Sequence, residues 1–211
     1  MTIPAVSDED LRVAALVLCD VAGQADELNR LDSVAGDGDL GITATAATTA
    51  LIQLLGELEP SEPAEALRRC GMAIARAAPS SMGTLVARAF LAAAREEPEG
   101  GGVAASAAWL DAGRRSIELR GGATIGQKSM LDALAPAITA LQANSDASVA
   151  QAVEAAADAA EAGAEATKQM DPVVGRASWL ADRSRGNVDA GAWLVAFVFR
   201  SWAERMQEVS S

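Results

Sequence analysis

The chain has 211 residues, a length typical of one domain, and we predict a single domain over residues 1–211. Its net charge of −12 disfavours nucleic acid as a partner, and any bound phosphate must arrive with cations. Because the chain has no histidine, imidazole nucleophiles, Ser-His-Asp triads and histidine-ligated zinc or haem are excluded.

Apolar residues recur with helical spacing along most of the chain, and no stretch alternates as a strand would. Ser7 and Asp10 resemble a capping box, which predicts a first helix over residues 8–31. Further helices are predicted over residues 43–58, 63–78, 85–97, 104–119, 130–143, 148–170 and 192–207. The pattern predicts an all-α fold of about eight helices.

Cys19 and Cys70 both lie in apolar helical stretches, so we expect them to be buried small hydrophobes. The N-terminal residues lack the basic and apolar regions of a signal peptide. No apolar run is long enough to cross a bilayer, so we expect a cytoplasmic protein without a membrane partner.

The strongest chemical signal is the Gly/Asp-rich stretch 32–41, which must be a loop. Asp32, Asp37 and Asp39 place three carboxylates within eight residues, and like charges this close favour a bridging cation. Oxygen ligands without Cys or His suit Mg²⁺ or Ca²⁺, and the spacing does not fit an EF-hand. The alternative interpretation is a solvated turn with helix-capping aspartates.

A second Gly-rich loop, residues 120–129, nearly matches a P-loop but carries one inserted residue and follows no strand. We therefore exclude a Walker A motif. Its glycines at 121 and 122 are compatible with close approach of a ligand or with an ordinary helix–helix turn.

The third polar region, residues 171–191, contains Arg176 among small residues, where a guanidinium can clamp a phosphate. We interpret Arg183 and Arg185 instead as members of paired surface charges. Ser80 and Ser81 begin a predicted helix, where they serve either an anion site or a plain N-cap. Together, the loops predict a nucleotide held through metal ions, an arrangement suited to phosphoryl transfer.

Three segments resemble the dihydroxyacetone kinase L-subunit (DhaL) family. LDSVAGDGDLG resembles that family's LDxxxGDGDxG loop, and RGGATIGQKSMLDAL resembles GGAxPGDKTMLDAL. In the third segment, AGAEATKQM resembles the family's AGAxxTxxM, and GRASWLADRSRGNVDAG, which follows it, resembles GRASYLGERSxGxxDPG. The motifs occur in the family's order and span nearly the whole chain.

The resemblance implies a barrel of eight antiparallel helices, with ADP or ATP bound at one end through two Mg²⁺ ions. It assigns Asp32, Asp37 and Asp39 as metal ligands and, with Arg176, as catalytic residues. It assigns nucleotide contacts to Leu40, Gly41, Ile42, Thr43, Ser80, Ser81, Gly121, Met130, Arg176, Asp189 and Gly191.

It also implies a partner K subunit that holds dihydroxyacetone covalently on its own histidine, since this chain has none. In one mode of the family ATP exchanges as a substrate. In the other mode, bound ADP is rephosphorylated by a phosphotransferase-system protein. Departures from the family pattern at Leu40, Ile125, Gln127, Asn187 and Ala190 leave room for a related ketose such as erythrulose.

Two alternatives use the same features differently. A regulatory module would sense the nucleotide and tune docking to another protein without turnover. A lipid-binding helical domain of the fatty-acid-kinase type would enclose an apolar ligand.

Overall fold

The computed structural model describes residues 5–58, 62–173 and 176–209, and within these ranges it contains helices and no strand. The predicted all-α class is therefore confirmed. The α-helices are α1 (Asp8–Ala22), α2 (Ala25–Asp32), α3 (Leu40–Leu55), α4 (Pro63–Ala77), α5 (Ser81–Ala93), α6 (Gly102–Gly121), α7 (Leu131–Ala143), α8 (Val149–Ala166), α9 (Ala181–Ser184) and α10 (Ala190–Val209). Two 3-10 helices, η1 (Thr167–Gln169) and η2 (Arg176–Leu180), lie between α8 and α9.

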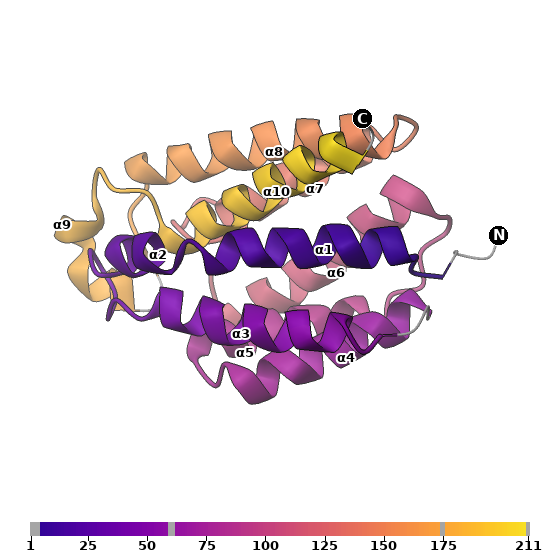
Figure 1. The fold of residues 1–211 in the computed structure, drawn as a ribbon. Helices are drawn as coiled ribbons and strands as arrows, with labels where there is room; N and C mark the ends of the chain where they lie inside the picture. The colour runs from indigo at the N-terminus through magenta and orange to yellow at the C-terminus, as the bar shows by residue number, and fades with distance from the viewer. Residues whose placement is uncertain (1–4, 59–61, 174–175, 210–211) are drawn as a thin grey trace.

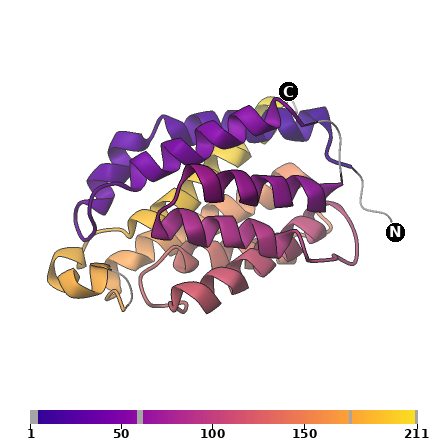
Figure 2. The ribbon, with the colours of Figure 1, turned by 90° about the horizontal axis from the view of Figure 1, so that it is seen from below.

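The long helices close into a ring. Within the described residues, α1 contacts α3, each of α3 to α7 contacts the next helix along the chain, α8 contacts α10, and α10 contacts α1 again. Neighbouring helices of the ring run in opposite directions, and α2 and α9 are both at the same end of the molecule (Figures 1 and 2). This is the arrangement that an antiparallel helical barrel requires. None of the described helices is long and apolar enough to cross a membrane.

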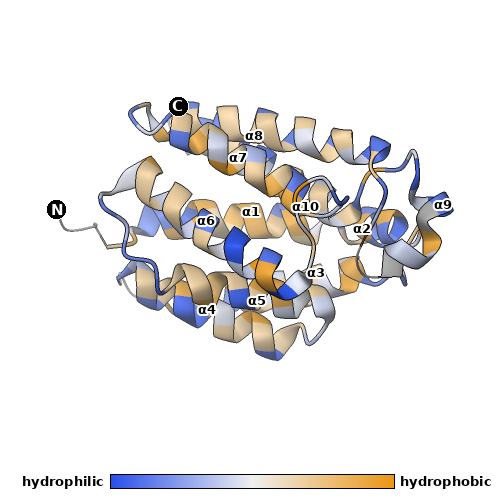
Figure 3. Cartoon of the chain, turned by 180° about the vertical axis from the view of Figure 1, so that it is seen from behind, coloured by the Kyte–Doolittle hydropathy of each residue, from blue (hydrophilic) through white to orange (hydrophobic). Residues whose placement is uncertain are grey.

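Small side chains set the close spacing of the helices. Ala152, Ala156 and Ala160 line the inner face of α8 and are fully buried. A side chain at Gly163 would place its Cβ 2.2 Å from the carbonyl oxygen of Asp132 on α7, so glycine is required at this contact. In Figure 3 most of the apolar residues lie on the helices, whereas the loops at both ends of the molecule, including those near α9, are largely hydrophilic.

The predicted first helix, residues 8–31, is wrong as a single element. Gly23 accommodates the end of α1, its N–H bonding to the carbonyl of Cys19, and Gln24 leaves helical geometry at φ −99° and ψ 14°. The break lets α2 take a new direction and bury Leu28 and Leu31 beside α10. Glycine weakens a helix at this point, and burial of the α2 leucines favours the new direction.

Several other boundaries move by a few residues. The helix predicted from 43 begins at Leu40, the one predicted from 85 begins at Ser81, and the one predicted to reach 170 ends as α8 at Ala166. The region 171–191, predicted as loop, contains η2 and α9. The capping box at Ser7 and Asp10 is confirmed, with both reciprocal hydrogen bonds present.

The expected burial of both cysteines is wrong for Cys19, which is exposed. The buried stripe of α1 comprises Val13, Val17 and Val21, and Cys19 lies two residues from this stripe on another face. Cys70 is half-buried on α4, and burial raises the pKa of its thiol to about 11.

Candidate functional site

A cavity of about 1020 Å³ lies among the loops and helix ends. Four parts of the chain line it: the loop before α3, the start of α5, the end of α6 with its following loop, and the segment before α10. The cavity therefore brings together all three loop regions that the sequence singled out. Its lining includes the predicted residues Asp32, Asp37, Asp39, Leu40, Thr43, Ser80, Ser81, Gly121, Met130, Asp189 and Gly191.

The acidic loop folds around the side chain of Asp32. Oδ2 of Asp32 accepts hydrogen bonds from the backbone N–H groups of Gly38 at 2.8 Å and Asp39 at 3.1 Å. Gly38 has φ +75°, which glycine adopts without strain, and a Cβ on Gly36 would meet Oδ1 of Asp32 at 2.2 Å. The two glycines of the motif are thus what lets the chain close tightly over this carboxylate.

The closed loop converges the three carboxylates. One oxygen from each of Asp32, Asp37 and Asp39 lies within 4.8 Å of the others. Asp32 is half-buried, whereas Asp37 and Asp39 are exposed toward solvent. An all-oxygen, anionic donor set of this size suits a hard divalent cation, which would relieve the repulsion between the carboxylates. The residues present therefore fit Mg²⁺.

The start of α5 forms a second wall. Oγ of Ser80 caps the helix by accepting the N–H of Gly83 at 3.0 Å, as an N-cap serine does. Thr43 on α3 donates its hydroxyl to the same Oγ at 3.2 Å, which joins α3 to the start of α5. Ser81 and Thr84 also line the cavity, so the positive end of the α5 dipole adjoins it.

The start of α10 forms a third wall. Oδ1 of Asp189 accepts the N–H of Ala192 at 2.8 Å, and its backbone N–H donates to Oγ1 of Thr167 at 2.9 Å. Burial raises the pKa of Asp189 to about 6, although its hydrogen bond with Ala192 and the charge of Lys128 act in the opposite direction. Asp189 is thus a buried carboxyl group in the wall of the cavity that titrates above the usual aspartate range.

The cavity also contains three cationic residues that were not predicted as site residues: Arg88, Arg120 and Lys128. The two arginines are exposed, and no ion pair among the described residues involves either one. Guanidinium groups in this position are suited to bind phosphate oxygens. The sequence around Arg88 on α5 and Arg120 on α6 does not indicate a binding site, because only the packing of the helices places these two residues at the cavity. Lys128 lies in the second Gly-rich loop, residues 120–129, but the sequence does not predict that its side chain is buried.

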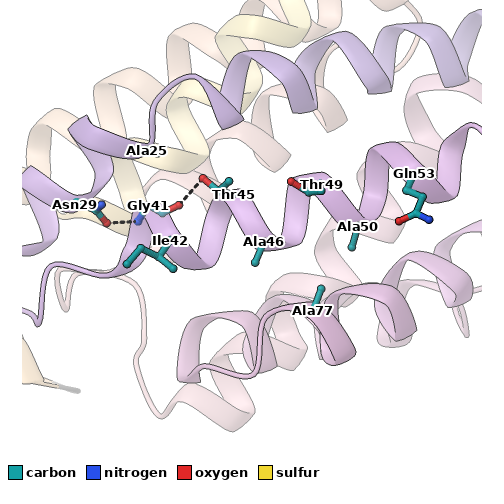
Figure 4. A pocket seen from close by; sticks show the side chains of 10 residues that line it. All are labelled: Ala25, Asn29, Gly41, Ile42, Thr45, Ala46, Thr49, Ala50, Gln53 and Ala77. Carbon is teal, nitrogen blue, oxygen red and sulfur yellow. Dashed lines mark hydrogen bonds between the residues drawn. The ribbon is translucent and has the colours of Figure 1, made fainter.

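Two of the residues predicted to contact the nucleotide do not line this cavity. Gly41 and Ile42 line a separate, shallower hollow of about 550 Å³ along α3. Figure 4 shows the N–H of Gly41 donating to Oδ1 of Asn29, at 2.8 Å, and Ile42 beside the hollow. Arg176 begins η2, but its side chain lies outside the described part of the structure. Arg185 pairs with Asp171 at 2.9 Å on the surface, which confirms the interpretation of that arginine.

The fold and site define an all-helical domain with a carboxylate cluster at a loop-lined cavity and no P-loop in its described residues. The model of the DAK2 domain matches residues 34–204 of this chain. The chain therefore belongs to the DAK2 domain family, and the resemblance stated from its motifs is confirmed.

Curated relatives differ in how much of their length this domain represents. The chain is 35% identical to the rat protein "Triokinase/FMN cyclase" over 88% of this chain and 32% of that protein. It is 35% identical to the "Dihydroxyacetone kinase" of Citrobacter freundii, over 91% of this chain and 34% of that protein. The chain thus spans about a third of these relatives.

A third relative is similar to this chain over most of its own length. It is the "PEP-dependent dihydroxyacetone kinase 1, ADP-binding subunit DhaL" of Listeria innocua, 30% identical over 82% of this chain and 84% of that protein. Among solved structures, the C. freundii dihydroxyacetone kinase in complex with AMP-PNP and Mg²⁺ has a TM-score of 0.78 and 30% identity. The match covers 97% of this chain and 35% of that one.

Proposed function

We propose that this chain is the nucleotide-binding part of a ketose kinase. It binds ADP or ATP together with two Mg²⁺ ions and passes a phosphoryl group to dihydroxyacetone or a related ketose. The observation that carries the proposal is the convergence of Asp32, Asp37 and Asp39 within 4.8 Å beside a cavity of about 1020 Å³. Relatives named as kinases support it, as does the relative named as an ADP-binding subunit.

The chain's own residues would divide the work as follows. Asp32, Asp37 and Asp39 would hold the metal ions, which when bound neutralise phosphate charge. Asp32 also fixes the loop through its bonds to Gly38 and Asp39. The N-terminus of α5 and Arg120 offer positive charge to the phosphates, and Arg176 is proposed to stabilise the transferring group.

The acceptor sugar requires a second protein or domain. In the family that this chain resembles, the ketose is held on a histidine, and this chain has no histidine. We therefore propose a K-subunit partner that presents the ketose to the cavity, with both proteins in the cytoplasm. The phosphoryl donor is either exchanging ATP or a phosphotransferase-system protein that recharges resident ADP.

Calorimetric titration of the EDTA-stripped protein with ADP and with ATP, each with and without Mg²⁺, tests the proposal. We expect binding that depends on Mg²⁺. Tight ADP binding with slow release would indicate resident ADP, whereas comparable ATP binding with fast exchange would indicate an ATP-dependent kinase. Absence of Mg²⁺-dependent nucleotide binding would contradict the proposal.

A matched pair of variants sharpens this experiment. Asp37→Asn removes one carboxylate charge from the cluster and should weaken Mg²⁺-nucleotide binding by about tenfold or more, because loss of even an outer-shell partner of a metal ligand typically costs about tenfold or more in metal affinity. Asp146→Asn makes the same chemical change at an exposed position between α7 and α8, away from the cavity. Equal affinities for the two variants would refute the assignment of the cluster.

A further inference from the structure

Lys128 crosses the interior between two loops of the cavity. Lys128 is only 4% exposed. Its Nζ donates hydrogen bonds to the carbonyl oxygens of Thr167 at 2.5 Å and Asn187 at 2.7 Å. These acceptors lie 39 and 59 residues further along the chain. One ammonium group therefore joins the loop before α7 to the end of α8 and to the segment before α10.

Thr167 makes a second connection to the same segment. It is fully buried, and its Oγ1 donates to the carbonyl of Ala164 at 2.6 Å while accepting the N–H of Asp189 at 2.9 Å. The carbonyl of Thr167 holds Lys128, and its hydroxyl holds Asp189. Three segments that are distant in sequence thus meet at one threonine.

The use of a buried lysine for this connection costs free energy, which a contact with a purely structural role would not need to spend. Burying an ammonium group is unfavourable unless hydrogen bonds and opposite charges compensate, and an apolar side chain would avoid the cost. Lys128 also has φ 57°, in the left-handed region that residues other than glycine seldom adopt. The charges around it are the carboxylates of Asp132, Asp171 and Asp189, and desolvation still lowers the pKa of Lys128.

The segments joined by Lys128 carry residues of the proposed nucleotide site. Met130 follows Lys128 by two residues, and Asp189 and Gly191 follow Asn187. All three line the cavity, and a Cβ on Gly191 would lie 3.3 Å from Cβ of Met130, so the two segments are in close contact there. Movement of either segment would change this wall of the cavity.

We infer that Lys128 and Thr167 are positioning residues that hold the Met130 and Asp189–Gly191 wall of the cavity in the geometry a nucleotide requires. The inference rests on the proposed function and assigns these two residues a part in it. The reason is preorganisation: a wall already fixed by buried hydrogen bonds loses less conformational entropy when the ligand binds.

The first test measures Mg²⁺-ADP affinity by calorimetry in full-length variants, with helix content and melting temperature recorded for each. Lys128→Met and Thr167→Val should each weaken binding by about tenfold, which corresponds to about 1.4 kcal/mol. Thr167→Ser keeps the hydroxyl group, so this variant should bind Mg²⁺-ADP with an affinity near the wild-type value. Lys168→Met is the matched control, because Lys168 pairs with Glu165 on the surface.

The Thr167 pair keeps the test decisive if Lys128→Met fails to fold. A merely structural role would lower the melting temperature of Thr167→Val yet leave the affinity of the folded protein unchanged, and that result would overturn the inference. If the wild type binds Mg²⁺-ADP and every folded variant binds equally well, this inference fails and the proposed function stands. If the wild type does not bind, both fail.

A second test follows Lys128 directly, since Lys128 and Lys168 are the two lysines of the chain. Amine labelling with a water-soluble succinimidyl ester, read by mass spectrometry, should modify Lys168 much faster than Lys128. Mg²⁺-ADP should slow the labelling of Lys128 further and leave Lys168 unchanged, because coupling between ligand and connection is reciprocal. Labelling of Lys128 that is indifferent to the nucleotide would contradict the inference.

Discussion

The carboxylate of Asp20 on α1 and the guanidinium of Arg205 on α10 form a two-point ion pair, with Nη2–Oδ1 at 2.6 Å and Nε–Oδ2 at 2.9 Å. Ser201 adds its hydroxyl to Oδ2 of the same carboxylate at 2.6 Å. The pair joins the first long helix to the last, at the contact that closes the ring. Neither side chain is more than 26% exposed, so this pair is partly shielded from solvent.

Asp20→Asn should therefore lower the free energy of unfolding by about 1–2 kcal/mol, because it weakens charge-assisted hydrogen bonds that link distant helices. Urea unfolding followed by circular dichroism measures the change. Glu65→Gln is the control, since Glu65 pairs with Arg68 within one helix on the surface and should leave stability unchanged. Equal effects of the two substitutions would show that the α1–α10 link has no special role.

The Asp20–Arg205 pair should also make the stability of the fold depend on pH under acidic conditions. The hydrogen bonds from Arg205 lower the pKa of Asp20 in the folded state. A lowered folded-state pKa stabilises the protein above the unfolded value, about 4, and this contribution disappears as the pH falls through the folded-state value. The stability difference between wild type and Asp20→Asn should thus be present at pH 7 and shrink below about pH 4. A difference that stays constant down to pH 2 would contradict the assignment.

Asp189 should give the opposite pH dependence. Burial raises its folded-state pKa to about 6, so the folded protein binds this proton more tightly than the unfolded chain does. The resulting stabilisation is complete below about pH 4 and is lost as the pH rises to about 6. Asp189→Asn removes this dependence, so the variant should gain stability relative to wild type between these pH values. Thermal unfolding of both proteins across pH 4–7 tests the prediction, and parallel curves would disprove it.

At Gly41, the start of α3 lies against the backbone at the start of α2. A Cβ on Gly41 would lie 1.9 Å from the carbonyl oxygen of Ala25, which is backbone and cannot move aside cheaply. Gly41→Ala should destabilise the fold by about 1–3 kcal/mol as in other overpacked sites. It should also weaken Mg²⁺-nucleotide binding, because Asp39 immediately precedes α3.

Gly56→Ala is the matched control for that substitution. A Cβ on Gly56 would meet its nearest atom at 3.5 Å, an ordinary contact, and φ is −66°. This variant should fold and bind the nucleotide like the wild type. A Gly41→Ala protein with wild-type stability would show that α2 and α3 separate easily.

Arg120 lines the cavity at the end of α6 and should contact phosphate. Arg120→Ala should weaken ATP binding by about tenfold, the cost of one charge-assisted contact, and make the remaining affinity less sensitive to salt. Arg95→Ala, in a position that does not line the cavity, is the control. Calorimetry at two salt concentrations measures both effects, and an unchanged salt dependence would remove Arg120 from the phosphate site.

Local sequence accounts for part of the site. The sequence predicts that Asp32, Asp37 and Asp39 share a cation because they lie within eight residues of one another, and the intervening glycines let the loop close around Asp32. The place of Ser80 before a helical stretch is typical of an N-cap, and the structure confirms the cap. Interactions that span three to eight residues depend little on the rest of the fold.

By itself, the sequence determined the helical class, the approximate helices and the acidic loop, because periodicity and capping act over a few residues. Tertiary structure decided where the chain breaks at Gly23, that Cys19 is exposed, and that Arg88 and Arg120 face the cavity. It alone brought Lys128 to Thr167, across 39 residues of sequence. Such contacts depend on how whole helices pack, and no local pattern specifies that packing.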